Sequence, residues 1–255
     1  MSTNTPAPKP VHPLARKLRL ARILNVVLGA VTAFLLVVVI AQSVPNAGQA
    51  AAGESQTPAA DDAAGEGGDG GSELATRDPN DPLAIGDVDA PVVLVEWADF
   101  RCPFCAVVTN KTLPIIFDEY VEKGLVRYEF RDVAFFGDES IDAAVAARAA
   151  GEQGRFPEYM TAVFAAAPEK GHPDMPREKL IGFAAEAGVP DLAKFEQDLD
   201  RADLRDAVLA STDTAQKLGV TSVPFFVAGD QAIAGAQPIE NFRALLDEQL
   251  AAAGE

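Results

Sequence analysis

The sequence predicts an α/β domain that contains a long helical insertion, in residues 81–255 of a 255-residue chain. A short apolar run rich in β-branched side chains, residues 91–98, is followed by Pro103 and a helical pattern. Residues 125–133 then alternate apolar and charged side chains, as a strand does. Residues 138–219 show helical spacing before a short hairpin and a last helix. These features together favour a small sheet interrupted by helices.

The N-terminal part of the chain differs from the rest in composition. Residues 1–22 carry five basic groups and no acid, and residues 23–41 then run for 19 positions without a charge. At about 1.5 Å per residue this run approaches the roughly 30 Å of a bilayer core, so we expect residues 23–44 to form a transmembrane anchor. The basic residues 1–22 should stay in the cytoplasm, which places the remainder of the chain outside.

A cleaved signal peptide is the alternative for this segment, because the triplet Ala50, Ala51 and Ala52 resembles a small-residue cleavage site. An anchor is favoured, since the apolar region of a signal peptide usually has only about 7–15 residues. Residues 45–80 consist mainly of Ala, Gly, Ser, Pro and acids. With almost no large apolar side chain to bury, they are predicted to form a disordered linker.

Charge and composition exclude some classes of function. Lys and Arg number 21 against 38 Asp and Glu, which gives a net charge of −17. Coulomb repulsion from phosphate therefore argues against nucleic acid as a partner. Two Cys and two His leave too few soft ligands for a zinc site within one chain. We expect no metal and no bound cofactor.

The elements of the domain follow from local patterns. Residues 91–98 are too short and too rich in β-branched side chains for a helix, whereas residues 104–122 have helix-compatible apolar positions. Pro114 should kink or reset that helix, because proline has no backbone N–H to donate. Gly124 marks the turn into the strand at 125–133, and the order strand, helix, strand favours a parallel βαβ unit.

The second half of the chain is read in the same way. Several helices are expected over 138–219, with Asp191 as one N-cap and Gly219 as one C-terminal glycine. Residues 223–234 then form a plausible hairpin that turns at 229–230. A last amphipathic helix is predicted from the spacing of its apolar residues, which are Ile239, Phe242, Leu245, Leu246 and Leu250.

The only two cysteines stand together in Cys102-Pro103-Phe104-Cys105. A strand that leads into a helix places Cys102 at the helix N-terminus, where unpaired N–H groups and the helix dipole favour a thiolate. Cys105 lies one turn further, where it can resolve a mixed disulfide formed at Cys102. Half a zinc site and a structural disulfide are the alternatives. The first lacks ligands, and the second would close too small a loop to constrain much of the chain.

Three separated stretches resemble the DsbA-like thiol oxidoreductases, which have a thioredoxin fold with an inserted helical subdomain. EWADFRCPFC, residues 96–105, is similar to the family's strand and active-site helix. GVTSVPFFV, residues 219–227, looks like the loop that carries the family's cis-proline, and GAQP, residues 235–238, matches the turn before its last helix. The resemblance covers about residues 81–255 and implies this fold.

The resemblance also implies roles for further residues. If Pro224 is cis, the backbone of Val223 would lie beside Cys102 and pair with an extended substrate peptide. An ordinary trans turn is the alternative. Glu96 stands where the family has an acid beneath the active site, and a raised pKa there would let it take the proton of Cys105. An edge or surface glutamate is the alternative for this position.

One departure concerns the redox potential. The better known DsbA dipeptide is Pro-His, whose imidazole helps to stabilise the thiolate, but Phe104 follows Pro103 here. The site should therefore be less oxidising, although Arg101 is expected to restore some positive potential beside Cys102.

The sequence thus predicts a membrane-anchored, extracytoplasmic thiol-disulfide oxidoreductase that donates the Cys102–Cys105 disulfide to newly exported proteins, where disulfides persist. The resemblance implies a membrane redox partner, linked to quinone, for reoxidation. Two alternatives remain open. One is a reductase or isomerase on the same fold, and the other is a tethered binding or chaperone-like module in which the cysteines are incidental.

Overall fold

The computed structural model describes residues 74–254. The expected cytoplasmic segment 1–22, the expected anchor 23–44 and most of the expected linker 45–80 lie outside the described residues. Within residues 74–254, no helix has both the length and the apolar character that a membrane span requires.

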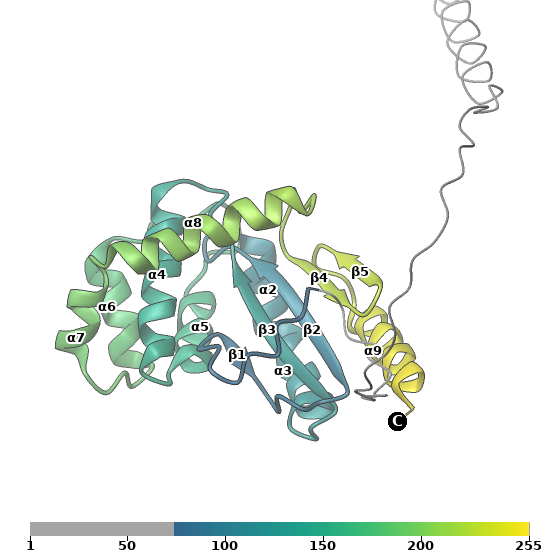
Figure 1. Ribbon diagram of the computed structural model, residues 1–255. Helices are drawn as coiled ribbons and strands as arrows, with labels where there is room; N and C mark the ends of the chain where they lie inside the picture. The colour runs from purple at the N-terminus through teal and green to yellow at the C-terminus, as the bar shows by residue number, and fades with distance from the viewer. Residues whose placement is uncertain (1–73, 255) are drawn as a thin grey trace, which may run out of the picture. The chain divides into compact units, whose positions relative to one another are not determined.

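Five strands form one mixed sheet in the order β1-β3-β2-β4-β5 (Figure 1). The central strand β2 (Val92–Ala98) runs parallel to β3 (Val126–Asp132), as the βαβ prediction requires. β1 (Ala84–Ile85) is antiparallel to β3. On the other side, β4 (Phe225–Ala228) is antiparallel to β2 and forms the predicted hairpin with β5 (Gln231–Ala234). Every residue of β2 is buried, which explains why its side chains are apolar apart from Glu96.

The crossover between β2 and β3 consists of three short helical pieces. α2 (Pro103–Lys111) is followed by α3 (Leu113–Ile116) and by the π-helix η1 (Phe117–Val121). Pro114 lies in the first turn of α3, where its missing N–H is not needed. The predicted reset of the helix at this proline is confirmed.

The predicted helical insertion is also confirmed. It consists of α4 (Asp138–Glu152), α5 (Phe156–Ala165), α6 (Arg177–Glu186), α7 (Leu192–Asp198) and α8 (Ala202–Lys217). Figure 1 shows α4 to α7 gathered beside the sheet, while α8 runs from them toward β4. The carboxylate of Asp191 accepts the backbone N–H of Lys194 at 2.8 Å and so caps α7, as predicted.

The sheet is covered on both faces. Leu94 belongs to the larger core cluster, together with side chains of α2, α3, α5 and α9 (Ile239–Ala253). Val93, Val95 and Trp97 belong to a second cluster, which includes residues of α8 and of the N-terminal segment. Because side chains alternate along a strand, Glu96 lies on the same face as Leu94.

The packed domain begins before the predicted boundary at residue 81. The carboxylate of Glu129 accepts the backbone N–H groups of Thr76 at 3.0 Å and Arg77 at 2.9 Å. The guanidinium of Arg77 donates to the carbonyl oxygen of Ala90 at 2.7 Å. Residues 74–80, which were predicted to belong to the linker, therefore pack against the sheet.

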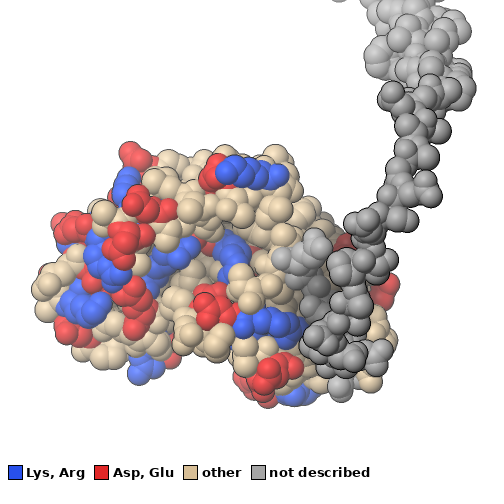
Figure 2. Space-filling view, in the orientation of Figure 1, with Lys and Arg blue, Asp and Glu red and all other residues tan. Residues whose placement is uncertain are grey.

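The visible surface carries both signs of charge. Figure 2 shows Lys and Arg side chains lying among Asp and Glu over the helical insertion, with large uncharged areas elsewhere on the described face. Interspersed charges of this kind do not form the continuous basic surface that phosphate backbones require.

Candidate active site

Both cysteines lie where strand β2 leads into α2. Cys102 is the N-cap of this helix and has an extended backbone, with φ −80° and ψ 120°. Pro103 occupies the first helical position. The thiol of Cys102 is only slightly exposed, whereas that of Cys105, one turn further, is fully buried, and both are free thiols. An incoming thiol or disulfide can therefore reach Cys102 first.

The two thiols differ in acidity. A hydrogen bond from Cys105 and the backbone N–H groups of Cys105 and Phe104 lower the pKa of Cys102 from 9.0 to about 7, although burial and the charge of Asp99 oppose this. Burial and the neighbouring Cys102 sulfur raise the pKa of Cys105 well above its ordinary value. Near neutral pH a large fraction of Cys102 is therefore ionised, which makes it the nucleophile of the pair, while Cys105 remains a thiol.

Glu96 is buried on the central strand, which excludes the edge or surface position that the sequence left open. The hydroxyl of Tyr128 donates to its Oε2 at 2.5 Å, while Oε1 has no hydrogen-bond partner among the described residues. Burial raises the pKa of Glu96 to about 8; the Tyr128 hydrogen bond opposes this rise and the charge of Cys102 adds to it. Glu96 also raises the pKa of Cys105, as expected for an acid beneath this thiol.

From the sequence alone, Tyr128 is predicted only as one of the apolar positions of the strand at 125–133. Its position opposite Leu94 in the parallel ladder places its side chain on the same face as Glu96. One signal was available, because the alternation of residues 125–133 places Tyr128 on the face opposite Arg127 and Glu129, whereas the apolar run at 91–98 does not alternate. Using it requires the register of the strands, which the local pattern does not contain.

The peptide bond between Val223 and Pro224 is cis, as the resemblance implied. It places the carbonyl oxygen of Val223 3.5 Å from the Sγ of Cys102, at the distance of a hydrogen bond from the thiol. The backbone N–H of Gly235 donates to the Pro224 carbonyl at 2.8 Å, which holds this loop against the start of the next turn. The backbone expected to pair with a substrate thus lies beside the nucleophile.

A cavity of about 530 Å³ opens beside Cys102. Its walls are mainly apolar and come from the α2 N-terminus, the insertion loops and the Val223 loop; they include Phe104, Phe135, Phe136, His172 and Val223. Phe104 is 62% exposed, so an aromatic ring borders the nucleophile on the surface. An apolar stretch of extended peptide fits such a surface better than a charged ligand does.

Arg101 lies differently from the expectation. Its guanidinium donates to the carbonyl oxygens of Phe136 at 2.6 Å and Pro173 at 2.8 Å, and it pairs with Glu139 at 2.9 Å. The carboxylate of Glu139 offsets its positive charge, and the main influences that lower the pKa of Cys102 come from Cys105 and Phe104 instead. The positive charge of Arg101 is therefore balanced by Glu139, and its expected contribution to the potential beside Cys102 stays a prediction.

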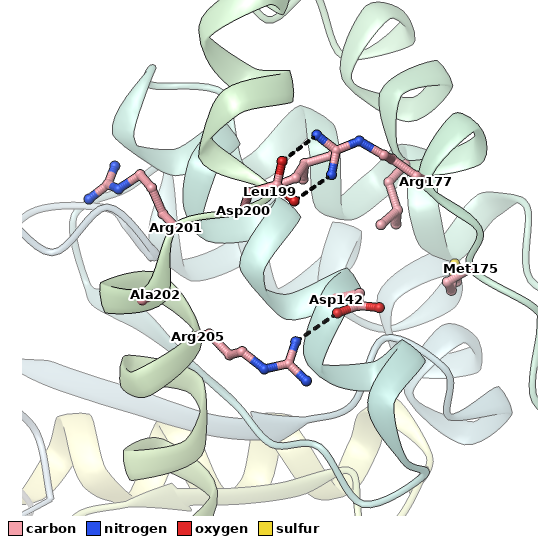
Figure 3. A pocket seen from close by; sticks show the side chains of 9 residues that line it. Asp142, Met175, Arg177, Leu199, Asp200, Arg201, Ala202 and Arg205 are labelled. Carbon is pink, nitrogen blue, oxygen red and sulfur yellow. Dashed lines mark hydrogen bonds and ion pairs between the residues drawn. The ribbon is translucent and has the colours of Figure 1, made fainter.

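A second cavity lies on the helical insertion (Figure 3). Arg177 makes a forked pair with Asp200, with distances of 2.9 and 3.0 Å, and Arg205 donates to Asp142 at 3.0 Å. Its lining contains neither cysteine. Because these guanidiniums are already paired with carboxylates, the cavity shows no chemistry that competes with the cysteine site.

The arrangement of sheet, helix N-terminal Cys-x-x-Cys and opposing cis-proline defines a thiol-disulfide oxidoreductase with a helical insertion in a thioredoxin fold. The sequence model of the family described as thioredoxin matches residues 78–248, and the chain belongs to this family.

Known relatives support this assignment. A probable disulfide bond formation protein D of Bacillus anthracis is 30% identical over 154 residues, which cover 58% of this chain and 70% of the relative. The crystal structure of oxidised BdbD from Bacillus subtilis has a TM-score of 0.62 at 23% identity and covers 66% of this chain and 92% of that chain. A thioredoxin-like oxidoreductase from Silicibacter pomeroyi DSS-3 has a TM-score of 0.57 at 26% identity, with coverages of 67% and 92%.

Proposed function

We propose that this oxidoreductase oxidises cysteine pairs of exported proteins by donating the Cys102–Cys105 disulfide. The observation that carries the proposal is that Cys102, the thiol that ionises near neutral pH, opens on an apolar cavity suited to an unfolded peptide. The relative from Bacillus anthracis bears the name of a disulfide bond formation protein, which is consistent with this direction.

The reaction consists of two thiol-disulfide exchanges. A substrate thiolate attacks the Sγ of Cys102, which forms a mixed disulfide and releases Cys105 as a thiolate. The neutral carboxyl of Glu96 then supplies a proton to Cys105, whose high pKa favours the thiol. A second substrate thiolate attacks the substrate sulfur of the mixed disulfide. Cys102 leaves as a thiolate, and the substrate has lost two electrons that now reside in the Cys102–Cys105 dithiol.

The substrate would be held by its backbone. Val223 offers a carbonyl beside the nucleophile, so an extended peptide can pair with it as an added strand. The apolar cavity beside Cys102 would then take side chains next to the substrate cysteine. Such side chains are exposed in proteins that have not yet folded, which fits a catalyst that acts soon after export.

The location proposed for this domain is outside the cell membrane. The basic residues 1–22 and the uncharged run at 23–41 are the support for a single anchor with its N-terminus in the cytoplasm. Disulfides also persist in compartments outside the reducing cytosol. The reduced dithiol would be reoxidised by a membrane partner, and the family resemblance suggests one linked to quinone.

The equilibrium of the Cys102–Cys105 pair with glutathione tests the direction of electron flow. An oxidase should be recovered mostly oxidised from cells and should equilibrate with a more oxidising glutathione buffer than thioredoxin does. A site recovered reduced, with a low potential, would instead establish the reductase alternative. A Cys102→Ser variant that keeps full function in cells would establish the tethered binding module.

A further inference from the structure

Two residues that precede the nucleophile connect it to the helical insertion. Asp99 is buried, and its Oδ2 accepts the backbone N–H groups of Phe135 at 2.7 Å and Phe136 at 3.3 Å. Its Oδ1 accepts the backbone N–H of Arg101 at 2.8 Å. One carboxylate therefore attaches the turn before Cys102 to the loop at 133–137, between β3 and α4.

The side chain of Arg101 extends this connection to a second loop. It donates to the carbonyl oxygen of Phe136 in the first loop and to that of Pro173 in the loop at 166–176. Glu139, which pairs with the same guanidinium, also accepts the backbone N–H of Met175 at 3.1 Å. Arg101 thus joins two loops, which it contacts at Phe136, 35 residues further along the chain, and at Pro173, 72 residues further along.

These loops form one wall of the cavity beside Cys102. The ring of Phe136 stacks on that of His172, with centroids 3.8 Å apart and planes 25° apart, and both residues line the cavity. The Nδ1 of His172 lies 2.9 Å from the carbonyl oxygen of Arg101, at hydrogen-bond distance. The aromatic wall is therefore attached through both the side chain and the main chain of Arg101.

We propose that Arg101 is a positioning residue that sets the affinity of the cavity for peptide substrates by holding the Phe136–His172 wall at a fixed place relative to Cys102. This inference rests on the proposed function, in which the cavity receives a protein thiol. A peptide contacts both the sulfur and the wall, whereas a small dithiol needs only the sulfur. Arg101 should therefore matter for peptides and very little for small thiols.

Two substitutions separate positioning from charge. Arg101→Lys keeps the positive charge, but a single ammonium group cannot reproduce the planar fork that reaches two carbonyls and a carboxylate. Arg101→Met removes both the charge and the fork. If Arg101 acted on the thiolate through its charge, as the sequence alone suggested, only the Met variant would change the reactivity of Cys102.

The test compares two reductants of the oxidised full-length protein. One is a peptide with two cysteines flanked by aromatic residues, and the other is dithiothreitol. In both Arg101 variants, KM for the peptide, taken as the concentration that gives half of the maximal single-turnover rate, should rise about tenfold. That maximal rate, taken as kcat, and the rate with dithiothreitol should stay within about twofold. Arg155→Met, which removes a surface arginine at the N-cap of α5 that is paired with Glu158, is the matched control and should leave both reactions unchanged.

Other outcomes are equally informative. An unchanged peptide KM in both variants overturns the proposal, and so does a Met variant that alone slows dithiothreitol. Should either Arg101 variant fail to fold, Glu139→Ala removes the carboxylate that holds the guanidinium and the Met175 N–H, and it should raise the peptide KM in the same direction. If the wild-type protein does not oxidise the peptide, the proposed function fails. The KM comparison is then made with the peptide disulfide and the reduced protein.

Discussion

The hydroxyl of Tyr128 donates a hydrogen bond of 2.5 Å to Glu96 on the buried face of the central strand. The other oxygen of Glu96 has no partner among the described residues, and burial raises the pKa of this carboxyl to about 8. Glu96 is therefore mostly protonated at neutral pH, next to a thiol whose own pKa is raised. A neutral carboxyl with one free oxygen is suited to exchange a proton with Cys105 when the disulfide opens or closes.

Tyr128→Phe should raise the pKa of Glu96 above its wild-type value of about 8. The Tyr128 hydrogen bond lowers this pKa, and phenylalanine keeps the ring but removes the hydroxyl. The carboxyl can be followed by infrared or carbon NMR titration of the reduced protein. Tyr159→Phe is the control, because its buried hydroxyl donates instead to the carbonyl of Leu180. A lowered or unchanged Glu96 pKa in the Tyr128 variant would contradict this account.

Glu96→Gln should slow turnover on the order of a hundredfold, as expected for loss of a general acid–base group. Gln keeps the shape and can still accept from Tyr128, but it cannot transfer a proton to Cys105. Stopped-flow measurement of disulfide exchange at several pH values, with the cysteines intact, follows this step. Unchanged kinetics would leave Glu96 with a purely structural role.

The same residue makes stability depend on pH. Because the pKa of Glu96 is raised from 4.5 to about 8 on folding, its contribution to stability is fully present below pH 4.5 and is lost as the pH rises through about 8. This pKa shift corresponds to a change in the free energy of unfolding on the order of 5 kcal/mol. Denaturation of the reduced protein between pH 4 and 9 should show this loss in the wild type and a flatter profile in Glu96→Gln. If the stability of the two proteins fell in parallel with pH, Glu96 would not be the source of the loss.

Glu129 should be important for stability although it lies away from the cysteines. It is buried and pairs with Arg127 at 3.0 Å, besides accepting the N–H groups of Thr76 and Arg77. Glu129→Ala leaves the buried Arg127 without its carboxylate partner and removes the acceptor of the Thr76 and Arg77 N–H groups, so the free energy of unfolding in urea should fall by roughly 3–5 kcal/mol.

A matched control shows whether burial is the cause. Glu158→Ala removes the partner of Arg155 in an exposed ion pair and should lower the free energy of unfolding by no more than about 1 kcal/mol. Equal losses in the two variants would mean that burial does not distinguish these carboxylates.

Local signals explain which parts of the fold the sequence predicted. The strand at 91–98, the reset at Pro114 and the cap at Asp191 each depend on a few neighbouring residues, and the structure contains all three. The start of the domain depended on distant contacts instead. Residues 76 and 77 have a polar composition typical of a linker, and long-range hydrogen bonds to Glu129 and to the Ala90 carbonyl order them.

The site was predictable to the same extent. The arrangement of Cys102 and Cys105 follows from a strand, a proline and a helix in sequence order. The partner of Arg101 does not, because Pro173 lies 72 residues away and the two meet only when the insertion packs. Tyr128 likewise meets Glu96 through the register of two parallel strands, which no local pattern contains.

Cys105→Ala should raise the pKa of Cys102 from about 7 toward its ordinary value of 9.0, because the hydrogen bond from Cys105 is the largest influence that lowers it. The rate of alkylation of reduced protein by iodoacetamide reports the thiolate, so the wild type should reach half of its maximal rate near pH 7 and the Ala variant at higher pH. Cys105→Ser is the matched control: its hydroxyl can still donate to the Cys102 sulfur, and its half-maximal pH should lie between the other two. Coincident profiles for all three proteins would show that the backbone N–H groups of α2 alone stabilise the thiolate, and that Cys105 serves only to resolve the mixed disulfide.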